Sequence, residues 1–266
     1  MLQNGYQTDL RDGVLTLTLD RPEAANAVPS EATEALTLLF RTVAKDRSVR
    51  AVLIRGNGSN FSAGGDIKAF ARSLKQDVET RRADFRIRLN RASDLVQSYV
   101  TLPVPVVAAC QGGVAGAGML FALGADVVLV DETTAFLFAH QRLGLTPDAG
   151  VSLLLPRAVG ARHAAALVLT AAKLNGAEAV RLGLANKIVA ADQLQQEAED
   201  VVRRIARAPA AVTIRAKRLL QPNNRDNVQQ LAAERDAIVA CVGEDDFAEG
   251  VQAFLDKRAP IFPSTV

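Results

Sequence analysis

Two side chains and a glycine-rich loop in the middle of the chain have the residue types and spacing of a site for acid–base chemistry. The stretch 112–118, GGVAGAG, stands directly before an apolar run that can begin a helix. The first N–H groups of a helix have no partner within it, and they favour negative charge. His140 and Asp148 follow roughly twenty to thirty residues later, where the chain again passes from loop to helix. This pattern predicts a pocket that stabilises an anion and holds one carboxylate nearby.

The composition narrows the classes of protein to which the chain can belong. Its 266 residues carry a net charge of +2, with 49% hydrophobic and 23% charged residues. This balance is ordinary for a globular chain and provides no basic surface for nucleic acid. Cys110 and Cys241 show neither disulfide-framework nor metal-site spacing, and only two histidines accompany them. Since no signal peptide or membrane-spanning stretch is recognisable, we expect a cytoplasmic protein without nucleic-acid, membrane or metal partners.

The elements that must position these residues begin with an alternation of predicted strands and helices. Leucine and threonine alternate over 13–20, as in a half-buried strand, and apolar residues recur at helical spacing over 30–45. A strand over 50–55 follows, then a helix around 85–100 and a buried strand over 104–110. Strands separated by helices predict parallel crossover units and an α/β fold.

Glycine-rich segments follow two of these strands at their carboxyl ends. The segment 56–65, GNGSNFSAGG, comes after the strand 50–55, and 112–118 comes after the strand 104–110. In open α/β sheets, loops at neighbouring carboxyl ends converge on one crevice, which is the usual ligand-binding place. The alternative is that both segments are only tight turns.

From residue 161 onward the pattern is helical nearly throughout, with 185–189 as the one candidate for an extended segment. We therefore predict an α/β core with the ligand site over 1–200 and a helical region over 201–266. The helical region has apolar faces that need cover, either from the core or from a neighbouring subunit.

Five segments, in this order and at this spacing, resemble the motifs of the enoyl-CoA hydratase/isomerase (crotonase) family. The resemblance implies a spiral of ββα units, a C-terminal helical trimerisation region, and homotrimers that often pair into hexamers. It also implies acyl-CoA thioester substrates of fatty acid metabolism, with coenzyme A as part of the substrate and no separate cofactor. The segments are RPEAANAV (21–28), FSAGGDIKAF (61–70), VPVVAACQGGVAGAGMLFALGADV (104–127), LGLTPDAGVSLLLPRAVG (143–160) and EGVQAFLDKR (249–258).

The same resemblance implies an oxyanion hole formed by two backbone N–H groups, those of Gly65 and Ala117. A thioester that loses an α-proton, or is attacked at its β-carbon, gathers negative charge on its carbonyl oxygen. Two preorganised donors stabilise that enolate, and losing one such donor costs on the order of 3 kcal/mol of barrier.

Coenzyme A contacts are implied at two further places. Segments around Ala24, Ala63, Asp66 and Ile67 resemble those that hold the adenine and pantetheine, with Lys68 near a phosphate. Phe254 and Lys257 match positions that cover the coenzyme A of a neighbouring subunit. For Lys68 and Lys257 a solvated surface lysine is the alternative. The pocket walls are expected from the segment 70–90 and from the C-terminal helices.

The departures from the family pattern bear on the reaction. Typical hydratases of the family carry two glutamates at the positions of Leu120 and His140, and hydration needs one group to activate water and one to protonate the α-carbon. Asp148 stands where hydratases usually have glycine and resembles the aspartate of family isomerases. One carboxylate suffices for a 1,3-proton shift, because it can take a proton from one carbon and return it to another.

Alternatives remain for both side chains and for the activity. Asp148 could instead cap the helix that follows it. His140 could bind substrate or water or assist as an acid or base, or it could be a hydrogen-bonded pocket residue. The predicted activity is double-bond isomerisation in an enoyl-CoA. The alternatives are hydration through His140 or Asp148, and a degenerate protein that binds acyl-CoA without turning it over.

Overall fold

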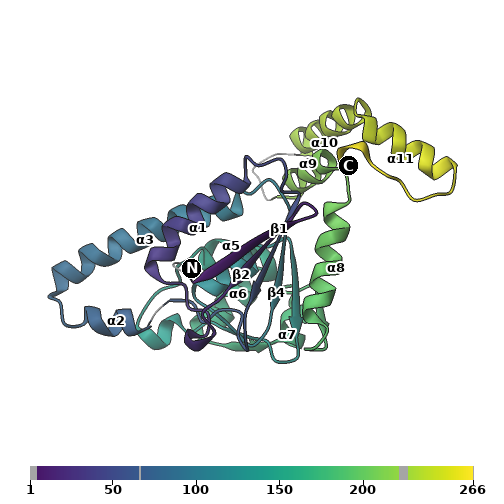
Figure 1. Ribbon diagram of the computed structural model, residues 1–266. Helices are drawn as coiled ribbons and strands as arrows, with labels where there is room; N and C mark the ends of the chain where they lie inside the picture. The colour runs from purple at the N-terminus through teal and green to yellow at the C-terminus, as the bar shows by residue number, and fades with distance from the viewer. Residues whose placement is uncertain (1–4, 66, 222–226, 266) are drawn as a thin grey trace.

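The structure is a computed structural model that describes residues 5–65, 67–221 and 227–265 (Figure 1). Its strands form two β-sheets. The larger sheet has the strand order β1-β2-β3-β4-β6-β9. The first pairing, β1 with β2, is antiparallel and all the others are parallel, which confirms the predicted crossover units. The strands are β1 (Tyr6–Arg11), β2 (Val14–Leu19), β3 (Ala51–Gly56), β4 (Val106–Cys110), β6 (Val127–Asp131) and β9 (Lys187–Val189).

The central strands of this sheet are mostly apolar because both faces are covered. Successive side chains of a strand point to opposite faces. In β3, Val52 and Ile54 therefore join the main core, while Ala51 and Leu53 join a second cluster under α8 (Leu194–Ala206). The main core lies under the helices α1 (Ser30–Val43), α3 (Val78–Val100), α4 (Ala117–Leu123), α5 (Val151–Val159), α6 (Ala161–Leu169) and α7 (Gly176–Arg181).

A smaller sheet lies beside the larger one, with the strand order β5-β7-β8. β5 (Gly113–Ala115) follows β4 and precedes α4, and β7 (Ala135–Leu137) follows β6 and precedes α5, so the unit of two strands and a helix recurs. β8 (Lys173–Asn175) pairs antiparallel with β7. The helical prediction for this segment was wrong, because three residues are too short to show an alternation of their own.

The C-terminal helices α9 (Ala210–Leu220), α10 (Asn227–Val242) and α11 (Asp245–Leu255) project from the body of the molecule (Figure 1). α9 is anchored by Lys217, whose Nζ lies 2.7 Å from Asp126 Oδ2 and donates to the Val104 carbonyl at 2.9 Å. Cover by a neighbouring subunit and a division near residue 200 stay predictions. Large apolar side chains of the projecting helices are exposed in the single chain: Leu220, Val228, Leu231, Ile238, Val239 and Phe254. No helix within the described residues has the length and apolarity to cross a membrane.

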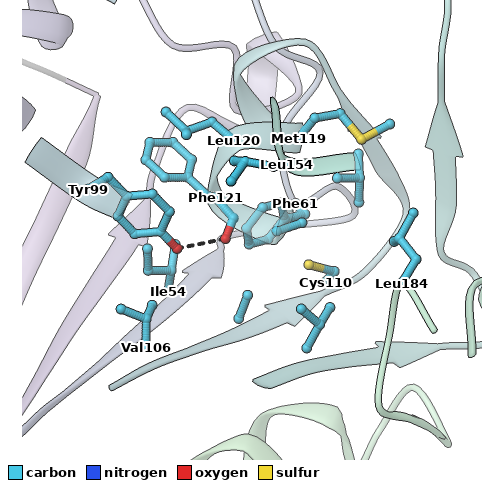
Figure 2. Packing of buried hydrophobic residues seen from close by; sticks show 14 of the residues in the cluster. Ile54, Phe61, Tyr99, Val106, Cys110, Met119, Leu120, Phe121, Leu154 and Leu184 are labelled. Atoms are coloured by element: carbon cyan, nitrogen blue, oxygen red, sulfur yellow. Dashed lines mark hydrogen bonds between the residues drawn. The ribbon is translucent and has the colours of Figure 1, made fainter. Parts of the chain in front are cut away.

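Tyr99 of α3 joins the core to the helix that follows the glycine loop (Figure 2). Its hydroxyl donates to the Phe121 carbonyl of α4 at 2.7 Å, and its ring centroid lies 5.1 Å from that of Phe40. The side chain is fully buried, and burial raises the pKa of its phenol well above the usual value. The neutral hydroxyl thus satisfies one of the last carbonyls of α4, which has no partner within the helix.

Tyr99→Phe should lower the free energy of unfolding by about 1–3 kcal/mol, because a buried carbonyl loses its hydrogen-bond donor. Urea unfolding at fixed protein concentration measures the change. Ser93→Ala is the matched control: its hydroxyl, on the same helix, also donates to a backbone carbonyl, that of Leu89 at 2.9 Å, but is exposed to water. A Tyr99→Phe effect no larger than that of this control would contradict the assignment.

The two thiols should differ in reactivity. Cys110 is fully buried in β4, and burial raises the pKa of its thiol far above the usual range, so little of the reactive thiolate forms. Cys241 is half-buried on α10. Titration with a disulfide reagent should modify one thiol in the native protein and the second only after unfolding. In a Cys241→Ser variant no thiol should react before denaturant is added; rapid native reaction there would show that Cys110 is accessible.

Candidate active site

The two predicted glycine loops lie against each other at the carboxyl ends of β3 and β4. The Ser62 N–H donates to the Gly113 carbonyl at 3.0 Å, and the Ala115 N–H donates back to the Ser62 carbonyl at 2.9 Å. This short parallel pairing between Ser62 and Val114 fixes the first loop beside the start of α4. The crevice predicted from the strand ends is therefore present.

Glycine is required where these loops cross. Gly64 has φ +91°, and a Cβ built there would lie 2.7 Å from both the Ala115 carbonyl oxygen and the Gly116 Cα. Gly116 has φ +46°, and its Cβ would lie 3.0 Å from the Gly64 Cα. Since L side chains rarely adopt such φ values and real Cβ contacts are longer, any other residue at either position would separate the loops.

Asn26 joins a third loop to this pair, and sequence reasoning missed it. Its amide Nδ2 donates to the carbonyls of Asn57 and Asn60 at 2.8 and 2.7 Å. The backbone carbonyl of Asn26 accepts a hydrogen bond from the Ser62 hydroxyl at 2.8 Å. The buried side chain thus positions the loop around Ala24 against the loop around Ala63. The signal was its place inside RPEAANAV, but only the fold shows which carbonyls it reaches.

A cavity of about 420 Å³ opens beside the crossing loops and is lined by Gly65, Ala117, His140 and Asp148. Ala117 is the first residue of α4, so its N–H has no partner within the helix. Neither the Gly65 nor the Ala117 N–H donates to another described residue. Two backbone donors of adjacent loops therefore border one cavity with an acid and an imidazole.

His140 and Asp148 approach each other in this cavity. His140 Nε2 lies 3.3 Å from Asp148 Oδ1; the His140 side chain is 11% exposed and that of Asp148 47% exposed. Gly150 is the N-cap of α5, and the Asp148 side chain does not cap the helix; only its backbone carbonyl accepts, from the Val151 N–H at 2.9 Å. The capping alternative is therefore wrong, and the carboxylate is available to the cavity.

The walls of the cavity are mainly apolar. Leu120 of α4, which the family resemblance aligns with a glutamate of typical hydratases, also lines the cavity. The segment 70–90 contributes as predicted, through Phe70 of α2 (Ile67–Ser73) and through Phe85, Arg88 and Leu89 of α3. The described C-terminal helices line no part of this cavity in the single chain, so that part of the wall prediction was wrong for one subunit.

The residues expected to contact coenzyme A are only partly brought together. Ala63 lines the cavity, and its N–H donates to the Ala25 carbonyl at 2.8 Å, next to Ala24. Asp66 lies outside the described residues, as do the side chains of Ile67 and Lys68 at the start of α2. Phe254 is 83% exposed and lines a separate hollow along α11, and Lys257 lies exposed beyond the end of that helix.

No group of three or more histidine, cysteine, aspartate or glutamate side chains could hold a metal ion within the part of the chain that the structure describes. Asp148 and His140 can transfer protons, and the Gly65 and Ala117 amides can donate hydrogen bonds.

Comparison with known proteins decides the family. The model of the enoyl-CoA hydratase/isomerase family matches residues 9–265, nearly the whole chain. The chain belongs to the enoyl-CoA hydratase/isomerase family. Its α/β core of recurring two-strand, one-helix units, followed by a helical region, is the crotonase fold of that family.

The relatives of this chain within the enoyl-CoA hydratase/isomerase family are named for different activities, some as isomerases and some as hydratases. The 1,2-epoxyphenylacetyl-CoA isomerase of Escherichia coli is 34% identical, over 94% of this chain and 95% of its own. A probable enoyl-CoA hydratase of Rhodobacter capsulatus is 33% identical, over 96% of both chains. A crystal structure of enoyl-CoA hydratase from Mycobacterium smegmatis superposes with a TM-score of 0.87 at 30% identity, over 98% of this chain and 99% of that one.

Proposed function

We propose that the protein is an enzyme that shifts a double bond in an enoyl-CoA thioester between the 2,3 and 3,4 positions. The observation that carries this proposal is the cavity itself: it is lined by Gly65 and Ala117, whose N–H groups donate to no described residue, and Asp148 is the one carboxylate among its described lining residues. The thioester carbonyl would accept from the two amides, and Asp148 would face the carbons on either side of the migrating bond.

The reaction proceeds in two proton transfers. Asp148 removes a proton from the α-carbon of a 3-enoyl thioester; the electrons of the broken C–H bond form a double bond between the α-carbon and the carbonyl carbon, and the carbonyl π electrons move onto the oxygen. The resulting dienolate is held by the Gly65 and Ala117 N–H groups, which are already oriented before charge develops. Asp148 then returns the proton to the γ-carbon. Its side chain is a carboxylate again, and the product is the conjugated 2-enoyl thioester.

Leu120 supports isomerisation over hydration. Addition of water requires one group to activate it at the β-carbon and another to protonate the α-carbon. At the position where the family resemblance leads one to expect a glutamate, the cavity presents the apolar, 1% exposed Leu120. An aliphatic wall neither binds nor deprotonates water. His140 assists by contacting Asp148 at 3.3 Å and orienting its carboxylate.

The contact between His140 and Asp148 also supports a second candidate, hydration, because two titratable groups in contact can bind and activate one water. One assay separates the candidates: 3-hexenoyl-CoA and crotonyl-CoA are each incubated with the protein and the products resolved by chromatography. Isomerisation gives the conjugated thioester from the first and very little 3-hydroxyacyl-CoA from the second. Rapid hydration of crotonyl-CoA would overturn the proposal in favour of the alternative. Tight binding of both without turnover would indicate a protein that only binds acyl-CoA.

The assembly and the coenzyme A contacts belong to the same proposal. Coenzyme A enters as part of the substrate along Ala24 and Ala63, and no further cofactor takes part in the steps above. Phe254 and Lys257 would reach a neighbouring subunit's coenzyme A in a homotrimer or a dimer of trimers, and the exposed apolar side chains of α10 and α11 support such an association.

A further inference from the structure

One cationic side chain in the cavity wall has no part in the proposed reaction. Arg88 of α3 lines the cavity, and its guanidinium carbon lies 4.9 Å from the ring centroid of Phe70 and 5.1 Å from that of Phe85. Both distances are within the range of a cation–π interaction, about 6 Å. No carboxylate pairs with Arg88 within the described residues. The cavity therefore holds a positive charge that no described acid neutralises.

The other arginines along α3 are placed differently. Arg82 pairs with Glu79 at 2.8 Å, and Arg91, which also borders the cavity, pairs with Glu34 at 2.9 Å. Arg86 is exposed and does not line the cavity, and Arg81 lines an adjoining hollow. Arg88, itself half-buried, is thus distinguished by its place in the cavity wall, its aromatic contacts and the absence of an acidic partner among the described residues.

The Phe70 ring connects Arg88 to the proposed carbonyl site. The Cζ of Phe70 lies 3.7 Å from the position of a Cβ built on Gly65, so the ring lies beside the residue that carries one of the two proposed oxyanion donors. The Arg88 guanidinium lies over the same ring. Suppose that the thioester carbonyl binds at Gly65 and that the acyl chain extends along α3. The chain then passes the Phe70 ring and reaches the Arg88 guanidinium beyond it.

The orientation of the guanidinium suits a carboxylate. The guanidinium carries five N–H donors in one plane, and contact with the aromatic rings uses none of them as a hydrogen bond to a carboxylate. A carboxylate can accept two of these hydrogen bonds side by side. Leu89, Ala92 and Leu95 on the same face of α3 also line the cavity, and such apolar surroundings strengthen an ion pair relative to water.

We infer that this cavity selects thioesters whose acyl group ends in a carboxylate, and that Arg88 is the specificity-determining residue. The inference rests on the proposed function only in taking the acyl-CoA carbonyl to bind at Gly65 and Ala117. Asp148 disfavours a second carboxylate beside it, so the terminal carboxylate is directed to Arg88 and the thioester to the crossing loops. A methyl-terminated chain of the same length leaves the guanidinium without a partner.

The test is a binding measurement with two saturated thioesters of equal length, adipoyl-CoA, whose chain ends in a carboxylate, and hexanoyl-CoA, whose chain ends in a methyl group. Isothermal titration calorimetry compares the wild type with Arg88→Gln, Arg88→Lys and the matched control Arg86→Gln. Arg88→Gln should weaken adipoyl-CoA binding roughly 10- to 100-fold, since a hydrogen-bonded charge is lost, and leave hexanoyl-CoA binding unchanged. Arg88→Lys should lose less, and Arg86→Gln should change neither.

Two results would overturn the inference. In one, the wild type binds hexanoyl-CoA at least as tightly as adipoyl-CoA. In the other, Arg88→Gln weakens both thioesters equally, as expected if the guanidinium contacts coenzyme A and not the acyl group. Because saturated thioesters have no double bond to move, preference for adipoyl-CoA without any isomerisation of 3-enoyl-CoA would overturn the proposed function alone. Failure to bind either thioester would overturn both.

Discussion

Asp148→Asn is expected to lower the rate of 3-enoyl-CoA isomerisation by about 10²- to 10⁴-fold, the usual contribution of a positioned acid or base. An amide has nearly the shape of a carboxylate but cannot accept a proton from carbon. Deuterium exchange at the α-carbon in heavy water should fall with the isomerisation rate, because both require the same proton abstraction. The melting temperature should change little, since the side chain is 47% exposed and does not cap α5.

The control for this variant is Asp94→Asn on α3. Asp94 lies on a helix that lines the cavity, but it is exposed and is not itself a lining residue. Its replacement should leave the isomerisation and the exchange unaltered. If Asp148→Asn exchanged α-deuterium at the wild-type rate, Asp148 would not be the base, and His140 would become the first candidate.

Ala117→Pro is expected to lower kcat by about 10²- to 10³-fold, the loss typical for removing one oxyanion donor. Proline has no N–H, and the first helical position tolerates it because that N–H has no partner within the helix. The preceding residue, Gly116, has φ 46° and ψ −121°, which is not helical, and it has no Cβ to meet the proline ring. The fold should therefore survive while one of the two donors is removed.

Ala117→Gly is the matched control, because it changes the side chain and keeps the N–H. It should retain kcat within a few-fold, while the proline variant should not. Circular dichroism and thermal unfolding would verify that both variants are folded. Full activity in a folded Ala117→Pro protein would show that the Ala117 amide does not stabilise the enolate.

Much of the fold could be predicted from the sequence because its main elements are periodic and long. The alternation over 13–20 and the helical spacing over 30–45 coincide with β2 and α1, and the tail helices α9 and α10 lie in the region 201–266 that was predicted to be helical. The short strands of the second sheet were not predicted individually. β8 lies in a segment expected to be helical. It pairs with β7, which is distant in the sequence, and a strand of three residues is too short to show a periodic pattern that would predict this pairing.

The sequence could predict those parts of the candidate site that are formed by backbone groups at fixed loop positions or by side chains that directly follow a predicted element. Gly65 and Ala117 stand at fixed places in their loops, and His140 and Asp148 follow one strand, so all four meet in one cavity. Arg88 and Asn26 could not be selected in this way. Arg88 is one of several arginines on α3, and only packing against Phe70 and Phe85 sets it apart. Asn26 acts through carbonyls more than thirty residues away.

The most direct test of the central claim is a crystal structure of the Asp148→Asn variant with a bound 3-enoyl-CoA, which the variant should trap unreacted. The thioester oxygen should lie about 2.7–3.1 Å from both the Gly65 and the Ala117 nitrogens, as oxyanion-hole geometry requires. The substituted amide side chain at position 148 should face the α- and γ-carbons of the acyl chain. A carbonyl oxygen beyond hydrogen-bond reach of either backbone amide, or a side chain at position 148 turned away from both carbons, would contradict the account.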